Sequence, residues 1–297
     1  MTDKYAVIGN PVAHSKSPLI HRMFAEQTGQ DISYEAILAP LDGFAATIER
    51  LRKEGYKGCN VTVPFKQEAA RIPTLSMLSA SVGLVHAANT LHWNADGELV
   101  ANNTDGFGLV RDIRINLGFD LTKKRILLMG AGGAARGVLY PLLYQEADFM
   151  PYQQTPSEIV IVNRTVQKAQ QICCESDFVS IAAQTNSFKP FSTNLSSCGY
   201  QDLANQQPFD VVINATSTGL TDEMPPLPPG IFAPGALAYD MMYGRETPFM
   251  KFAREHGAAV VSDGLGMLVE QAAEAFFLWR GVRPDSGPVI SALRATK

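Results

Sequence analysis

Short apolar segments alternate with amphipathic segments along most of the chain. The candidate strands cover residues 5–9, 33–38, 59–63, 125–130, 158–163, 210–216, 236–243 and 258–263. Several of them are continuous apolar runs, which is typical of parallel strands buried on both faces. Segments of helical period, such as "SPLIHRMFAEQTG" and "DGFAATIERLRKEG", lie between them. This alternation predicts an α/β fold.

The pattern divides into two series near Asp105–Gly106. We expect residues 1–105 to form an α/β substrate-binding catalytic domain, completed by helices in residues 265–297. Residues 106–264 are expected to form a doubly wound, Rossmann-type nucleotide-binding domain. Three stretches indicate surface loops or inserts: residues 144–158, the polar residues 185–208, and the proline-rich residues 221–235, which cannot be helical throughout.

Composition excludes several classes of protein. The chain has 297 residues, 46% of them hydrophobic, which is enough for two cores. The net charge of −4 and the lack of a basic block argue against nucleic-acid binding, and no apolar run is long enough for a membrane span. The four cysteines lack paired CxxC spacing, so we expect no metal site. Reduced thiols and the lack of an apolar signal sequence favour a cytoplasmic protein.

A glycine-rich turn follows the candidate strand "RILLMG". The motif is G-x-G-x-x-A, and its residues are Gly130, Ala131, Gly132, Gly133, Ala134 and Ala135. Gly130 permits a tight turn, Gly132 lets the backbone approach a pyrophosphate, and Ala135 keeps the following helix close to the strand. A purely structural glycine turn is the alternative. The strand–turn–helix context favours dinucleotide binding.

The residues at the end of the next strand, "EIVIVN", indicate which of the two nicotinamide cofactors is favoured. It ends in Asn163-Arg164-Thr165, with Lys168 one turn later, and it carries no acidic residue to hold a ribose 2′-hydroxyl. An arginine suits a 2′-phosphate, so the sequence favours NADP. In the alternative interpretation, Arg164 is an ordinary exposed residue and Thr165 only a helix N-cap.

The stretch "NVTVPFKQEAAR" contains an unusual lysine. Asn60–Val63 predict a strand, Pro64 suits the first position of a helix, and residues 65–71 are expected to be helical. Lys66 would then lie in the first turn, where the helix dipole disfavours a cation by about 0.3–1 kcal/mol. A lysine kept at such a place suggests a functional role.

Other polar residues allow both a structural and a functional interpretation. Ser15 and Ser17 precede a helix and suit a carboxylate site, although Ser17-Pro18 is also a good N-cap sequence. Asp105 lies in "ANNTDGFG", which by itself is typical of a turn. Asn89 lies in a strand-like run, where a buried amide needs partners. Gln271, on a helix face beside an apolar stripe, either faces a cleft or is solvated.

The motifs together resemble the shikimate dehydrogenase family along nearly the whole chain. The matching pieces, in order, are "GNPVAHSKSP", "NVTVPFK", "AANTL", "NNTDGFG", "GAGGAARG", "NRT", "INATSTG", "YDMMYGRETPF" and "DGLGMLVEQAAEAF". The resemblance implies reversible NADPH-dependent reduction of 3-dehydroshikimate to shikimate in chorismate and aromatic amino-acid biosynthesis. It also implies two domains with the active site in the cleft between them, and small-molecule partners only, in a monomer or homodimer.

The resemblance also implies roles for individual residues. Ser15 and Ser17 would bind the substrate carboxylate. The hydroxyls and the reacting ketone would be held by Asn60, Thr62, Lys66, Asn89, Asp105 and Gln271. Lys66 and Asp105 would be catalytic, with Lys66 as either the proton donor or an electrostatic group. Tyr243 would line the cleft, Gly264 would lie near the nicotinamide, and Thr216 and Ser217 would lie beside the cofactor.

Two alternatives remain from the sequence. The first is an NAD-preferring quinate/shikimate dehydrogenase, which would carry an acidic residue near Arg164, and this sequence has none there. The second is a non-catalytic NADP-binding sensor, which would lack Lys66 or Asp105, and both residues are present. His86, Ala88 and Ala101 depart from the family's usual residues, which bears on fine specificity more than on the reaction.

Overall fold

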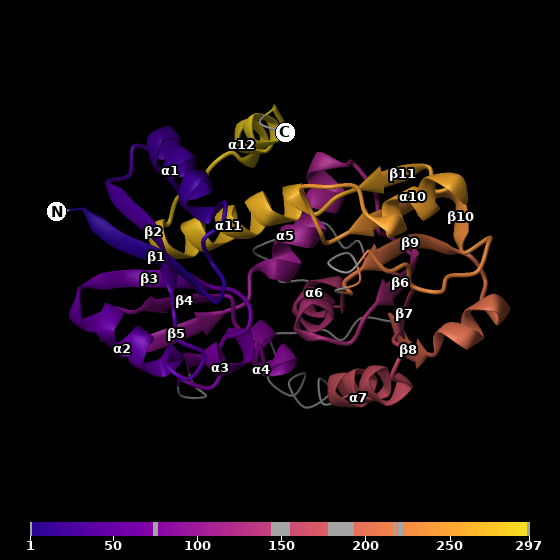
Figure 1. Ribbon diagram of the computed structural model, residues 1–297, viewed down its shortest axis with the longest axis horizontal. Helices are drawn as coiled ribbons and strands as arrows, with labels where there is room; N and C mark the ends of the chain where they lie inside the picture. The colour runs from indigo at the N-terminus through magenta and orange to yellow at the C-terminus, as the bar shows by residue number, and fades with distance from the viewer. Residues whose placement is uncertain are drawn as a thin grey trace. The chain divides into compact units, whose positions relative to one another are not determined.

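The computed structural model describes residues 2–73, 77–143, 155–177, 193–216, 218 and 222–295. They form two compact units (Figure 1). Unit 1 contains residues 1–108 and 268–297, and unit 2 contains residues 109–267. Unit 1 is therefore built from both ends of the chain, with unit 2 as one continuous segment between them.

Unit 1 contains a five-stranded sheet in the order β2-β1-β3-β4-β5. The strands are β1 (Asp3–Gly9), β2 (Ile32–Leu38), β3 (Tyr56–Val61), β4 (Thr90–Trp93) and β5 (Leu99–Asn102). The pairs β1–β2 and β1–β3 are parallel, whereas β4 runs antiparallel to both β3 and β5. The carboxyl ends of β1, β3 and β5 and the amino end of β4 therefore meet at one edge of the sheet.

Helices cover both faces of this sheet. The helices of the unit are α1 (Ser17–Thr28), α2 (Phe44–Lys53), α3 (Lys66–Ala69), α4 (Ala80–Val85), most of α11 (Leu265–Arg280) and α12 (Ser286–Ala295), of which α2 and α11 illustrate the two covered faces. Strand residues Ala6 and Ile8 pack with Phe44 and Leu51 of α2 in one apolar cluster. On the other face, Tyr5 stacks on Trp279 of α11. Burial on both faces explains the apolar runs in the parallel strands.

Unit 2 contains a six-stranded parallel sheet in the order β11-β10-β9-β6-β7-β8. The strands are β6 (Arg125–Met129), β7 (Glu158–Val162), β8 (Asn194–Cys198), β9 (Phe209–Asn214), β10 (Phe232–Asp240) and β11 (Val260–Ser262). When the six strands are numbered by their order along unit 2, the sheet has the strand order of a doubly wound nucleotide-binding fold. The order in which successive strands are added to the sheet reverses between β6 and β9. The predicted Rossmann-type architecture is confirmed.

Successive strand residues of unit 2 face two separate cores. Ile126 and Leu128 pack in one cluster with residues of α6 (Gly133–Leu143), and Leu127 and Met129 pack in the other with residues of α10 (Pro248–Glu255). The remaining helical segments are α5 (Asp105–Arg111), the π-helical turn η2 (Asp112–Asn116), α7 (Val166–Asp177) and the 3₁₀ helix η3 (Tyr200–Asn205). Within the described residues, no helix is long and apolar enough to cross a membrane.

Some local predictions were wrong. The polar stretch 185–208, expected to be a loop, contains β8 and η3 in its described part, because β8 completes the sheet beside β7 despite its serines. The proline-rich stretch 221–235 already includes the start of β10 at Phe232. The expected strand 236–243 ends at Asp240. The expected insert 144–158 lies largely outside the described residues.

Candidate functional site

Polar residues of unit 1 converge at the edge of the sheet where β3 and β5 end and β4 begins. Asn60 lies at the end of β3, opposite Thr90 at the start of β4. Thr90 in turn pairs with Asn102, the last residue of β5. Asp105, the first residue of α5, follows three residues later. The mixed sheet thus brings three separate motifs of the sequence to one edge.

Lys66 and Asp105 form an ion pair at this edge. The distance from Lys66 Nζ to Asp105 Oδ2 is 2.6 Å. The Lys66 side chain is 24% exposed and that of Asp105 10% exposed, so the pair is shielded but reachable from solvent. Charge-assisted contacts of this kind are stronger than neutral hydrogen bonds. The arrangement holds an ammonium group at a fixed position with further N–H bonds left to donate.

The local structure around Lys66 differs from the sequence prediction. α3 covers only Lys66–Ala69, and Pro64 lies in the turn that precedes it, after a cis peptide bond. A single helical turn has few aligned peptide dipoles, so the expected dipole penalty on Lys66 is largely removed. Lys66 is held by its carboxylate partner, and its own carbonyl accepts a hydrogen bond from the Ala88 amide at 2.8 Å.

Asn89 connects most of the buried polar residues. Its side-chain nitrogen lies 2.8 Å from Asp105 Oδ1 and 2.9 Å from Thr104 Oγ1. The same nitrogen lies 3.2 Å from Gln271 Oε1. Its oxygen accepts from the Thr104 amide at 2.8 Å and from the Thr90 hydroxyl at 3.0 Å. Asn89 therefore fixes the Asp105 carboxylate in the orientation that presents Oδ2 to Lys66.

Gln271 is buried rather than solvated, at 9% exposure. Its nitrogen donates to the Leu268 carbonyl at 2.8 Å, which directs its oxygen toward Asn89. The structure thus brings five of the predicted residues into one network, namely Asn60, Lys66, Asn89, Asp105 and Gln271.

The two serines lie at the start of α1. Ser17 is the first residue of the helix and follows Lys16 at the N-cap position, where no side-chain cap forms. The N-cap interpretation of Ser17 was therefore wrong. Ser15 Oγ accepts from the Ser17 amide at 3.2 Å. Thr62 lies directly after β3, half-buried, and its amide donates to the Ile8 carbonyl at 2.9 Å.

Sequence reasoning missed several members of the network. Tyr34 of β2 donates its hydroxyl to Asn60 Oδ1 at 2.7 Å. Asn103 accepts from the Asp105 amide at 3.1 Å and donates to the Ala87 carbonyl at 2.9 Å. Thr90 and Thr104 are fully buried and bond to Asn89. The consecutive polar residues of "NNTD" were a usable signal, since so many amides and hydroxyls beside a buried strand need partners.

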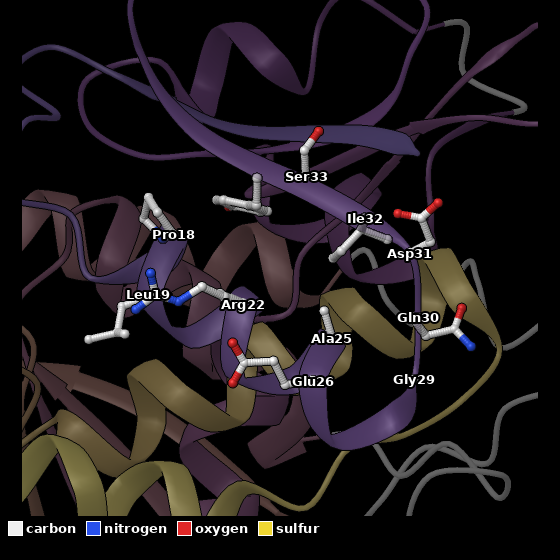
Figure 2. A pocket seen from close by; sticks show the side chains of 11 residues that line it. Pro18, Leu19, Arg22, Ala25, Glu26, Gly29, Gln30, Asp31, Ile32 and Ser33 are labelled. Atoms are coloured by element: carbon white, nitrogen blue, oxygen red, sulfur yellow. The ribbon is translucent and has the colours of Figure 1, made fainter. Parts of the chain in front are cut away.

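A hollow of about 600 Å³ lies between α1 and β2 of unit 1 (Figure 2). Its lining includes Arg22 and Glu26 from the helix and Ser33 from the strand. Tyr34 is the residue that this lining shares with the network around Asn60. The predicted substrate residues do not line this hollow.

In unit 2, the glycine-rich motif joins β6 to α6 at the reversal of strand order. Gly130 has φ +108°, and a Cβ there would lie 3.1 Å from the carbonyl oxygen of Ala215, which follows β9. At Gly132 a Cβ would meet no atom within 4 Å, so the backbone faces open space. Ala135 is fully buried against the sheet. An open glycine backbone at a helix N-terminus and a switch point fits a dinucleotide pyrophosphate.

The residues after β7 are accessible. Arg164, Thr165 and Lys168 are exposed, and Asn163 donates to the Thr165 carbonyl at 2.9 Å, which shapes the turn into α7. Burial raises the pKa of Tyr200 to about 12, and the positive charge of Arg164 opposes this shift.

A buried carboxylate organises the loops after β9 and β10. Asp240 is fully buried, and burial raises its pKa. It accepts from the Thr247 hydroxyl at 2.5 Å, from the Met242 amide at 2.9 Å and from the Asn214 side chain at 3.2 Å. Asn214 also accepts from the Thr216 hydroxyl at 2.6 Å. These bonds fix the backbone after β9 and β10, on one side of the switch point.

Three predicted residues remain, and one of them closely follows Asp240 in the sequence. Tyr243 follows it by three positions and is half-buried, and burial raises its pKa. Gly264 packs so closely on Met241 that a Cβ would lie 2.3 Å from the Met241 carbonyl oxygen. Ser217 lies outside the described residues. Within the described part of the chain, no cluster of three His, Cys, Asp or Glu residues is arranged to hold a metal ion.

Comparison with known proteins gives consistent matches. Two family profiles match, the shikimate dehydrogenase substrate binding domain at residues 7–91 and the shikimate 5′-dehydrogenase C-terminal domain at residues 264–294. A shikimate dehydrogenase (NADP(+)) of Methylobacillus flagellatus is 55% identical over 294 residues, covering 99% of each chain. Among solved structures, an Ael1 enzyme from Pseudomonas putida is 47% identical, with 98% of each chain covered and a TM-score of 0.85. The shikimate 5-dehydrogenase of Thermus thermophilus, solved with NADP(H) and shikimate, is 30% identical over 100% of both chains, with a TM-score of 0.79.

Proposed function

The chain belongs to the NADP(+)-dependent shikimate dehydrogenase family, and we propose that Lys66 and Asp105 carry out its proton chemistry. The protein is an oxidoreductase that acts on a CH–OH group and interconverts 3-dehydroshikimate and shikimate with NADP(H). The observation that supports the two catalytic assignments best is the 2.6 Å ion pair, shielded but not sealed from solvent.

Reduction of a ketone requires a hydride and a proton. The bound cofactor supplies the hydride, and the protein must supply the proton and the geometry. The Lys66 ammonium has three N–H bonds and uses one on Asp105. A remaining N–H can donate to the oxygen on which negative charge develops, which lowers the barrier by general-acid and electrostatic effects. Asp105 keeps the ammonium in place, and Asn89 keeps Asp105 in place.

The other polar residues are proposed to hold the substrate. Ser15 and Ser17 would bind its carboxylate through their hydroxyls at the N-terminus of α1. The ring hydroxyls would bond to Asn60, Thr62, Asn89, Gln271 and Tyr243. Asn60 and Asn89 are buried at 6% and 2% exposure, so their orientation is set before the ligand arrives.

The residues of unit 2 fit NADP. The backbone of the turn Gly130 to Ala135 would hold the pyrophosphate, since Gly132 leaves open space where a Cβ would stand. Asn163, Arg164, Thr165 and Lys168 would hold the adenosine end, with Arg164 on the 2′-phosphate. Thr216, Ser217 and Gly264 would lie along the nicotinamide half.

Shikimate oxidation, followed by absorbance with NADP⁺ and with NAD⁺ in parallel, tests the activity and the cofactor preference together. We expect the enzyme to oxidise shikimate when NADP⁺ is present. The kcat/KM for NADP⁺ should exceed the kcat/KM for NAD⁺ at least tenfold. Equal values would reject the role of Arg164. No turnover with either cofactor would reject the enzymatic assignment.

Location and assembly are also proposals. The four cysteines are free, which supports a reducing compartment such as the cytoplasm. A monomer or homodimer is proposed, and light scattering after size-exclusion chromatography distinguishes the two.

A further inference from the structure

Behind the predicted substrate residues of unit 1 lies a stack of buried rings. His21 of α1 is fully buried, and its ring lies parallel to that of Tyr34, 4.1 Å away between centroids. Trp279 lies 5.4 Å from His21, and Phe276 lies 6.1 Å from it. These contacts hold the Tyr34 ring from one side and fix the direction of its hydroxyl.

The Tyr34 hydroxyl contacts a residue proposed to bind substrate. It donates to Asn60 Oδ1 at 2.7 Å. Burial raises the pKa of Tyr34 well above its usual value of 10. The phenol is therefore protonated throughout the working range and remains a hydrogen-bond donor.

This bond determines what Asn60 presents to a ligand. Its nitrogen is already within hydrogen-bond distance of the Asn89 carbonyl at 3.2 Å and of Thr90 Oγ1 at 3.1 Å, so both N–H bonds have partners. Its oxygen accepts from Tyr34 with one lone pair and keeps the other. Asn60 is thus set to accept a hydrogen bond from a ligand hydroxyl. Without the Tyr34 hydroxyl, the Asn60 oxygen loses the donor that holds it in place, and the bond from the Asn60 nitrogen to the Asn89 carbonyl is left as the main contact that sets the amide orientation.

We propose that Tyr34 is a positioning residue for the substrate, which acts by orienting the Asn60 amide toward it. The inference rests on the proposed function, because it takes Asn60 as a substrate-binding residue. Tyr34 comes from the edge strand β2 and is also one of the residues that line the hollow between α1 and β2. It supports the site from outside the motifs that contain the predicted ligand-binding residues.

The test is Tyr34→Phe, which keeps the ring stack and removes the hydroxyl. The KM for shikimate should rise by about 2- to 12-fold, which corresponds to the loss of one hydrogen bond of about 0.5–1.5 kcal/mol. The kcat should stay within about twofold, because an interaction equal in ground and transition states affects KM alone. The KM for NADP⁺ should not change, because Tyr34 belongs to the other unit.

Tyr5→Phe is the matched control. Tyr5 lies directly opposite Tyr34 in the β1–β2 register, is 2% exposed, and also contacts Trp279, but its hydroxyl faces Arg280. The substitution Tyr5→Phe removes a buried phenol hydroxyl from the same sheet and leaves the contacts of Asn60 unchanged. We expect a loss of thermal stability in both variants and a raised KM for shikimate only in Tyr34→Phe.

A double-mutant cycle identifies the route of the effect. If Tyr34 acts through Asn60, then Tyr34→Phe should change the KM for shikimate much less in an Asn60→Ala background than in the wild type. A KM for shikimate that is unchanged in Tyr34→Phe, or that rises equally in Tyr5→Phe, would overturn the inference. Wild-type turnover in the same assay tests the proposed function separately, since a failure there would appear before any variant is compared.

Discussion

Replacement of Lys66 by methionine tests the central assignment of the site. The substitution keeps most of the stem's bulk and removes the charge that lies 2.6 Å from Asp105. Loss of a positioned proton donor costs typically 10²- to 10⁴-fold in rate, or about 2.7–5.4 kcal/mol of barrier. We therefore expect kcat for shikimate oxidation to fall at least 100-fold, with little change in the KM for NADP⁺.

The structure changes the stability expectation for this variant. From the sequence, a lysine opposed by a helix dipole would be neutral or slightly stabilising to remove. In the structure, its removal leaves Asp105 at 10% side-chain exposure with Asn89 as a remaining partner. Loss of a charged partner from such a group costs about 1–3 kcal/mol. Lys66→Met should therefore unfold at a lower temperature than the wild type.

The assay is shikimate oxidation under saturating NADP⁺, with a thermal melt of each protein. Lys53→Met is the control, because Lys53 forms an exposed ion pair with Glu49 at 75% and 54% side-chain exposure. That pair should contribute little to stability and nothing to turnover. If Lys66→Met turns over shikimate within a few-fold of wild type, the proton-donor and electrostatic roles are both wrong.

Three further predictions concern the cofactor, the serines and acid stability. Arg164→Ala should lower kcat/KM for NADP⁺ by about 10- to 150-fold, from the loss of about 1.5–3 kcal/mol, and should leave NAD⁺ turnover nearly unchanged; equal losses with both cofactors would count against a 2′-phosphate contact. The double variant Ser15→Ala with Ser17→Ala should raise the KM for shikimate, and since no N-cap bond is lost, a normal KM with a large drop in melting temperature would reject the carboxylate site. Burial lowers the pKa of His21 from 6.5 to about 3, so the neutral ring's contribution to stability is fully present above pH 6.5 and is lost as the pH falls toward 3. Between pH 7 and pH 4.5 the wild type should lose about 3 kcal/mol more unfolding free energy than His21→Phe, at about 1.4 kcal/mol per pH unit below 6.5, and parallel curves in urea titrations would show that His21 does not titrate on unfolding.

The sequence predicted the layers of both units because periodicity and glycine placement are local signals. Eight expected strands exist in the structure, although β10 is shorter at its end than predicted. β8 was missed because its "NLSSC" alternates weakly and takes its stability from pairing with β7. The short α3 was overestimated because a proline suggested a helix start, whereas the chain makes a turn there.

The candidate site, like the fold, was only partly predictable from the sequence. Motifs identified Lys66, Asn89 and Asp105 individually, and the sheet topology brings them together at one edge. Periodicity did not reveal that Asn89 holds Asp105, because that contact depends on the antiparallel return of β4 and β5. Tyr34 and His21 belong to apolar-facing positions of a strand and a helix, where a polar atom cannot be distinguished from core packing without coordinates.

The composition of unit 1 from both ends of the chain has a consequence for biosynthesis. Arg280 donates to the Asp3 carboxylate at 2.5 Å, and the rings of Phe276 and Trp279 complete the stack around His21. While the polypeptide is still being translated, these partners do not yet exist, so the residues that emerge first remain without part of their core. Unit 2 is continuous and can fold as soon as residue 267 is available. We therefore expect unit 2 to complete its fold before unit 1, the reverse of the order in which domains usually fold during synthesis.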